Sequence, residues 1–174
     1  EKEQIDLLTL SAHKIGGPKG IGCLWMKDNY DFIEEPLKGT LNTAGIIGFG
    51  QAIDNIDTIK FTEHCEKLKT CFLNTLYFRS NISIHQRFKK THPSTLSLHC
   101  PDIEGVDLLM RCSDRGVYFS TGSACDSNDI KPSHVLTACG LTNEEALATI
   151  RVSFGIQNTE EEVKEAAKII ALAY

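Results

Sequence analysis

The chain has 174 residues, of which 41% are hydrophobic and 24% are charged, a composition typical of an ordinary soluble globular protein. Its 18 basic and 23 acidic residues give a net charge of −5, which offers no electrostatic case for direct nucleic-acid binding, and no apolar run is long enough to span a membrane. The seven cysteines form no Cys-x-x-Cys pair, which argues against a disulfide framework or a zinc site and favours a reducing compartment.

The stretch from Ser11 to Gly22 carries the first candidate site. It follows the apolar run 5–10 and precedes the run 23–26, so the pattern predicts two strands joined by a glycine-rich turn, with Lys14 at the end of the first strand. Burial at such a strand end favours the neutral amine, which is a nucleophile for carbonyls. Ser11 and His13 can donate hydrogen bonds to an anion, which suits a cofactor bearing an aldehyde and a phosphate. The alternative is a surface lysine beside a hairpin turn.

Two helices are predicted next. Residues 28–36 indicate a polar loop, and residues 39–43 precede a run with helical apolar spacing from Ile46 to Ile56, for which Asn42 or Thr43 can supply the cap. A second helix is predicted from Phe61 to Phe78, and we expect it to link two domains. Its apolar face consists of Cys65, Leu68, Phe72 and Leu76.

The remaining elements alternate between strands and helices. Strands are predicted at 82–85, 95–99, 117–119 and 149–155, and helices at 105–115, from Pro132 to Gly140, and at the C-terminal end. Gly116 is expected to end its helix in a left-handed conformation, and residues 142–145 and 159–162 match capping boxes. This mixture predicts a small α/β domain from about residue 61. Cys23, Cys71, Cys112 and Cys139 are expected to be inert core residues.

The loop from Ser120 to Lys131 places Cys125 among small polar residues, where its thiol is expected to be exposed. A nucleophilic cysteine also needs a thiolate, and nothing local in the sequence supplies a cation, while Asp126 opposes ionisation. The residues alone leave two hypotheses open, a catalytic thiol and a harmless surface thiol.

Two distant motifs together resemble one family. The pattern Ser11-x-His13-Lys14, followed by the glycine-rich residues 17–22, resembles the cofactor-lysine segment of cysteine desulfurases, which are pyridoxal-phosphate enzymes of the class V aminotransferase family. Residues 120–127 resemble the subgroup whose active cysteine lies in Ser-Gly-Ser-Ala-Cys within a long loop. Residues 132–136 and 151–155 fit the same family, so the resemblance covers nearly the whole chain.

The resemblance implies an α/β fold of the fold-type-I pyridoxal-phosphate transferases. Residues 1–60 are then the C-terminal part of the large cofactor-binding domain, and residues 61–174 are the small C-terminal domain that carries the cysteine loop. The implied activity converts L-cysteine to L-alanine and leaves a persulfide on Cys125. Lys14 is the implied Schiff-base and proton-transfer residue.

The resemblance also assigns binding residues. Ser11 and His13 are implied phosphate ligands, and Thr40 matches a threonine that reaches the phosphate across a dimer interface. Arg151 is implied to clamp the substrate carboxylate, a task that suits a guanidinium fork. The alternatives are an ordinary helix-start residue for Thr40 and an exposed strand charge for Arg151.

Partners and location follow from the same resemblance. It implies a homodimer that passes sulfur from L-cysteine to an acceptor, either an iron–sulfur scaffold protein or a tRNA-modifying enzyme. The expected compartment is the cytoplasm, or the mitochondrial matrix in a eukaryote, with no membrane, metal or direct nucleic-acid binding.

The chain departs from the family pattern in two places. A family segment between the equivalents of Leu37 and Lys38 is missing here, and the residues that stack on and face the cofactor ring lie before position 1. We therefore expect the 174 residues alone to be inactive, although the protein that contains them is an enzyme. Three other interpretations stay open: a selenocysteine lyase, another class V aminotransferase, and an inactive module that docks sulfur acceptors.

Overall fold

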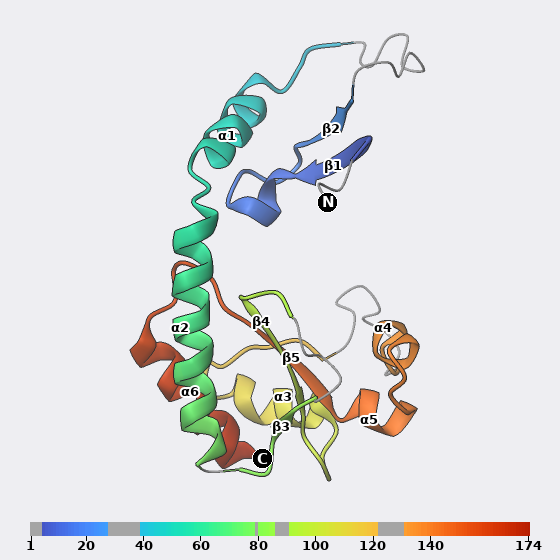
Figure 1. The fold of residues 1–174 in the computed structure, drawn as a ribbon, viewed down its shortest axis with the longest axis vertical. Helices are drawn as coiled ribbons and strands as arrows, with labels where there is room; N and C mark the ends of the chain where they lie inside the picture. The colour runs from blue at the N-terminus through green and yellow to red at the C-terminus, as the bar shows by residue number, and fades with distance from the viewer. Residues whose placement is uncertain (1–4, 28–38, 79, 86–90, 122–130) are drawn as a thin grey trace. The chain divides into compact units, whose positions relative to one another are not determined.

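The computed structural model describes residues 5–27, 39–78, 80–85, 91–121 and 131–174. The chain divides into two compact units, an N-terminal unit (Glu1–Asp57) and a C-terminal unit (Thr58–Tyr174), which carry separate sets of elements (Figure 1).

The N-terminal unit is a β-hairpin packed on one helix. Strands β1 (Leu7–Ser11) and β2 (Gly22–Met26) pair antiparallel, and between them lies the short 3₁₀ helix η1 (Ala12–Ile15). Helix α1 (Thr43–Asp54) follows, and its N-cap Asn42 accepts a hydrogen bond from the Gly45 amide at 3.0 Å. The predicted strands and cap are confirmed, but Lys14 lies on η1, beyond the end of β1.

Glycines allow the turn after η1 to approach α1 closely. A Cβ atom added at Gly17 would lie 3.2 Å from the Ala52 Cβ atom, and one added at Gly48 would lie 3.1 Å from the Pro18 ring. Both contacts are tighter than ordinary van der Waals spacing, so larger side chains at Gly17 or Gly48 would push the turn off the helix. The position of η1 therefore depends on this glycine-mediated contact.

The C-terminal unit is a three-stranded sheet with helices packed against it. The sheet order is β3 (Ser83–Ile84), β4 (Thr95–His99) and β5 (Thr149–Ser153), all antiparallel. Helices α2 (Thr58–Tyr77) and α6 (Glu160–Ala173) pack along each other, and α3 (Gly105–Ser113) contacts α6 (Figure 1). The short helices α4 (His134–Ala138) and α5 (Asn143–Leu147) precede β5.

One hydrophobic cluster holds this unit together. Helix α2 buries the four residues that the helical spacing predicts, and Phe72 meets Phe154 edge-on at a ring-centroid distance of 5.6 Å. The strands alternate as expected, so one sheet face is apolar and the other is polar. The strand residues in this core are Leu96, Leu98, Ile150 and Val152.

Helix ends follow the sequence closely. Thr142 and Thr159 each form a complete capping box, with Glu145 and Glu162 as the reciprocal partners. Gly116 has the predicted positive φ, at 76°. The two capping boxes depend on residues three positions apart, which is why local sequence predicts them.

Three predictions about this fold are wrong. Residues 117–119 form no strand, because Ser120 alone makes a bridge to the sheet. The helix predicted from Pro132 begins at His134, with Ser133 as its N-cap. Cys23 and Cys139 are exposed, whereas Cys112 is buried as expected.

Removing a core side chain from the sheet should destabilise the C-terminal unit strongly. Leu98 is fully buried, so Leu98→Ala is expected to lower the free energy of unfolding by about 2–5 kcal/mol through lost burial and a residual cavity. The matched control is Leu172→Ala on α6, where the leucine is 69% exposed and the change should be within about 0.5 kcal/mol. Urea denaturation measures both, and equal midpoints for the two variants would contradict the described core.

Candidate active site

Helix η1 presents two polar side chains beside one buried anchor. Ala12 is completely buried, whereas His13 and Lys14, the next two residues, are exposed. The turn ends at Gly16, whose φ of 84° is left-handed and whose amide donates to the Ala12 carbonyl oxygen. Because the backbone is fixed by Ala12 and Gly16, the Lys14 side chain projects from a defined position.

The side chains on this turn are not engaged by other described residues. No hydrogen bond or ion pair joins the side chain of Ser11, His13 or Lys14 to another described residue, and the Ser11 hydroxyl does not cap η1. The expected burial of Lys14 at a strand mouth is wrong for the described part of the chain, because its side chain is exposed there. An accessible amine, an imidazole and a hydroxyl therefore share one turn.

This donor set fits a pyridoxal-phosphate ligand. A lysine amine can bond covalently to an aldehyde, and a hydroxyl and an imidazole N–H can donate to phosphate oxygens. Thr40, two residues before the cap of α1, is also exposed, and its side chain has no hydrogen bond to a described residue. The structure thus groups Ser11, His13 and Lys14 on one turn, with Thr40 in the same unit.

Arg151 lies at the centre of β5 on the polar face of the sheet. Its neighbours Ile150 and Val152 are buried on the opposite face, and Arg151 itself is exposed. Its guanidinium donates to the Ser120 hydroxyl at 3.1 Å, and among the described residues no carboxylate pairs with it. An arginine without an acidic partner has donors available for an anion.

Sequence patterns do not single out Ser120, because its contact with Arg151 spans 31 positions. No local motif encodes such a pairing, which depends on how the chain returns to the sheet edge. The nearest signal in the sequence is a hydroxyl residue at the border of the cysteine segment. The contact makes Ser120 a residue that the sequence analysis missed.

The candidate nucleophile Cys125 falls in residues 122–130, outside the described residues. The described cysteines divide by burial. Burial raises the pKa of the Cys100 thiol to about 12, with Cys112 nearby adding to the effect, and it also raises the pKa of Cys65 and Cys112. These three buried thiols are protonated at neutral pH and are poor nucleophiles.

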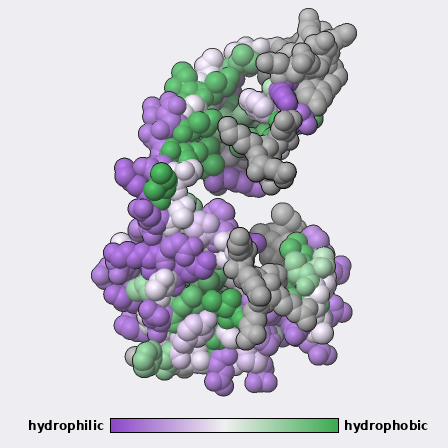
Figure 2. Space-filling model, in the orientation of Figure 1, coloured by the Kyte–Doolittle hydropathy of each residue, from purple (hydrophilic) through white to green (hydrophobic). Residues whose placement is uncertain are grey.

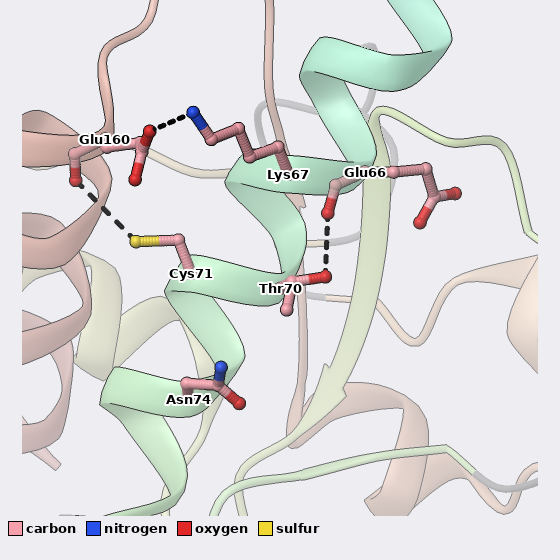
Figure 3. Close-up of a pocket in the computed structure, with 6 residues that line it drawn as sticks. All are labelled: Glu66, Lys67, Thr70, Cys71, Asn74 and Glu160. Atoms are coloured by element: carbon pink, nitrogen blue, oxygen red, sulfur yellow. Dashed lines mark hydrogen bonds and ion pairs between the residues drawn. The ribbon is translucent and has the colours of Figure 1, made fainter.

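A shallow hollow of about 530 Å³ lies along α2 (Figure 3). Lys67 and Glu160 form an ion pair at 2.5 Å across it, and the Cys71 thiol donates to the Glu160 carbonyl oxygen at 3.9 Å. Of the candidate site residues that the structure describes, none lines this hollow. These contacts tie α2 to the start of α6.

Within the described ranges, no group of three or more His, Cys, Asp or Glu side chains is arranged to hold a metal ion. No helix among the described residues is both long and apolar enough to cross a lipid bilayer.

The chain belongs to the class V aminotransferase family. The sequence model of Aminotransferase class-V matches residues 1–38 and 31–165, which is most of the chain. The two matched segments overlap at residues 31–38.

Similar curated proteins are cysteine desulfurases. The chain is 37% identical to cysteine desulfurase IscS of Vibrio vulnificus (strain YJ016) over 186 residues, which cover 99% of this chain and 46% of that protein. It is 36% identical to cysteine desulfurase IscS of Neisseria gonorrhoeae (strain ATCC 700825 / FA 1090), covering 98% of this chain and 45% of that protein. The chain thus spans about half the length of these relatives.

Solved structures agree on the fold. A NifS-like protein superposes with a TM-score of 0.80 at 30% identity, covering 97% of this chain and 46% of that one. The NifS-like protein from Rickettsia africae ESF-5 superposes with a TM-score of 0.77 at 28% identity over 97% of this chain and 46% of that one. The likeness confirms the predicted α/β fold of the fold-type-I transferases.

Proposed function

We propose that the protein containing this chain is a pyridoxal-phosphate-dependent cysteine desulfurase that converts L-cysteine to L-alanine and holds the released sulfur as a persulfide on Cys125. The observation that carries the proposal is the η1 turn, where an exposed Lys14 amine stands beside Ser11 and His13 in a chain of the class V aminotransferase family. Cysteine desulfurase relatives and a solved structure described as SspA in complex with cysteine, which is 29% identical, support the substrate.

Each candidate residue has one task in this reaction. When bound, pyridoxal phosphate supplies an electron sink that weakens bonds at the substrate α-carbon. Lys14 attaches the cofactor and moves protons at the substrate carbon, while Ser11, His13 and Thr40 bind the phosphate. Arg151 binds the substrate carboxylate.

Cys125 completes the sulfur transfer. Its thiolate attacks the substrate sulfur, a new S–S bond forms, and the substrate C–S bond breaks. The substrate carbon keeps the electron pair of the broken bond and takes up a proton, which gives alanine. Sulfur and electrons therefore balance without an external oxidant, and the persulfide can pass to an acceptor.

The direct test is product analysis. The full-length protein loaded with pyridoxal phosphate should release L-alanine from L-cysteine, with an equal amount of sulfide once a thiol reductant is present. Absence of L-alanine from a cofactor-loaded sample would contradict the proposal.

Replacing Arg151 should weaken substrate binding. The variant Arg151→Lys keeps the positive charge but loses the bidentate fork, so we expect the KM for L-cysteine to rise about 10–100-fold. Steady-state kinetics measure it, and Arg115→Lys, at an exposed arginine after α3, is the matched control. An unchanged KM in Arg151→Lys would show that the carboxylate binds elsewhere.

Partners and location complete the proposal. We propose a homodimer, supported by apolar side chains that are exposed on α1 in the described unit, such as Ile47, which is 73% exposed. Figure 2 shows hydrophobic residues on the surface of the N-terminal unit. The proposed sulfur acceptor is an iron–sulfur scaffold protein or a tRNA-modifying enzyme, reached in the cytoplasm or the mitochondrial matrix. Residues 1–174 alone, which span 46% of the Vibrio relative, are proposed to be inactive.

The domain boundary belongs to the same proposal. We propose that residues 1–60 are part of the cofactor-binding domain and residues 61–174 form the small domain. The division of the chain into Glu1–Asp57 and Thr58–Tyr174 supports this proposal.

A further inference from the structure

Ser120 and Arg151 form a small pairing at the edge of the sheet. The Ser120 amide donates to the Arg151 carbonyl at 3.0 Å, and the Arg151 amide donates to the Ser120 carbonyl at 2.7 Å. This double exchange is the hydrogen-bonded pair of an antiparallel ladder. Ser120 therefore continues the sheet by one residue on the side of β5 that β4 does not occupy.

The pairing places one serine opposite Arg151 on each side of β5. Residues directly opposite in a ladder point to the same face, and Arg151 is opposite Ser97 on β4 and Ser120 on its other side. Of these two serines, only Ser120 receives a hydrogen bond from Arg151, from Nη2 to Oγ at 3.1 Å. The structure thus contains a matched pair of positions, one bonded to the arginine and one not.

The Ser120 contact constrains the arginine without neutralising it. A hydroxyl accepts one N–H and leaves the charge and the remaining guanidinium donors available. A free arginine has many rotamers and loses that freedom when it binds a carboxylate, so fixing it beforehand lowers the cost of binding. Among the described residues no acidic side chain competes for Arg151.

Ser120 itself has a firm position. Its backbone is held by the two bonds to β5, and the next residue, Thr121, lies against Gly105 at the start of α3, where an added Cβ would be 3.2 Å from the Thr121 methyl group. The backbone from which the hydroxyl projects is therefore held by two elements of the C-terminal unit. From this position the Ser120 hydroxyl accepts from the Arg151 guanidinium and restricts its orientation.

We propose that Ser120 is a positioning residue that holds the Arg151 guanidinium ready for the carboxylate of an amino-acid substrate. The inference rests on the proposed function, in which Arg151 binds that carboxylate. Ser120 acts through Arg151, so its loss should weaken substrate binding and leave the chemical step nearly unchanged.

The test compares isosteric variants in the full-length, cofactor-loaded protein. Ser120→Val and Ser120→Thr have the same shape, but only threonine keeps the hydroxyl. We expect Ser120→Val and Ser120→Ala to raise the KM for L-cysteine about 5–10-fold with kcat within about twofold, and Ser120→Thr to restore the wild-type KM within about twofold. Ser97→Ala, at the matched position, should change neither constant.

A second measurement separates positioning from a general structural defect. Competitive inhibition by cysteamine, which lacks the carboxylate, should be equal in the wild type and Ser120→Val, whereas inhibition by L-alanine should weaken by the same factor as the KM. Equal KM values in Ser120→Val and Ser120→Thr, or an equal loss of cysteamine binding, would overturn the inference while leaving the proposed function intact. Absence of L-cysteine turnover by the wild type would overturn the proposed function and this inference with it.

Discussion

Lys14→Ala is expected to abolish both the visible absorbance of protein-bound pyridoxal phosphate and the turnover of L-cysteine. The lysine is assigned two tasks, attachment of the cofactor and proton transfer at the substrate carbon, and alanine performs neither. We expect turnover to fall by at least about 10³-fold. Absorbance spectra after dialysis and an L-alanine assay measure the two effects.

The control for Lys14 lies close to it in the sequence, at Lys19. Lys19 is also exposed and lies in the loop between η1 and β2, so Lys19→Ala removes an equal charge from the same region. It should keep the absorbance and most of the activity. If Lys19→Ala lost the absorbance and Lys14→Ala kept it, Lys19 rather than Lys14 would be the lysine that attaches the cofactor.

Cys125→Ala is expected to eliminate persulfide formation. Sulfur transfer needs a thiolate at the substrate sulfur, and the buried thiols of Cys65, Cys100 and Cys112, which have raised pKa values, cannot replace it. We expect L-alanine formation from L-cysteine to fall about 10³-fold, while cofactor absorbance stays at the wild-type level. Trapping with an alkylating reagent and mass spectrometry locate the persulfide.

The matched control is Cys139→Ala, at the end of α4, which removes an exposed thiol from the same unit. This variant should form the persulfide at the wild-type rate. A persulfide that persists in Cys125→Ala but disappears in Cys139→Ala would move the nucleophile to Cys139. Turnover of selenocysteine by Cys125→Ala, with L-cysteine turnover lost, would favour the selenocysteine lyase interpretation.

Local patterns predict much of the fold. The helical spacing of Cys65, Leu68, Phe72 and Leu76 matches the buried face of α2, because a helix in contact with a core must repeat its apolar residues every three or four positions. Both capping boxes and the Asn42 cap are also found where predicted. In each case the residues that make up the pattern follow one another at spacings of at most four positions.

Non-local contacts set the limit of such prediction. The run 117–119 has the residue types of a strand, but of the residues around it only Ser120 pairs with the sheet. That pairing joins Ser120 to Arg151, which lies 31 positions later in the sequence. The exposure of Lys14 could not be predicted either. Neighbouring residues place it beside a strand, whereas its burial depends on what packs over η1.

Chemical trapping of the cofactor tests the central claim most directly. Sodium borohydride reduces the bond between pyridoxal phosphate and its lysine to a stable amine, and digestion with peptide mass spectrometry then identifies the modified residue. We predict that the full-length protein carries the adduct on Lys14. An adduct on another lysine, or none on a protein that has bound the cofactor, would contradict it.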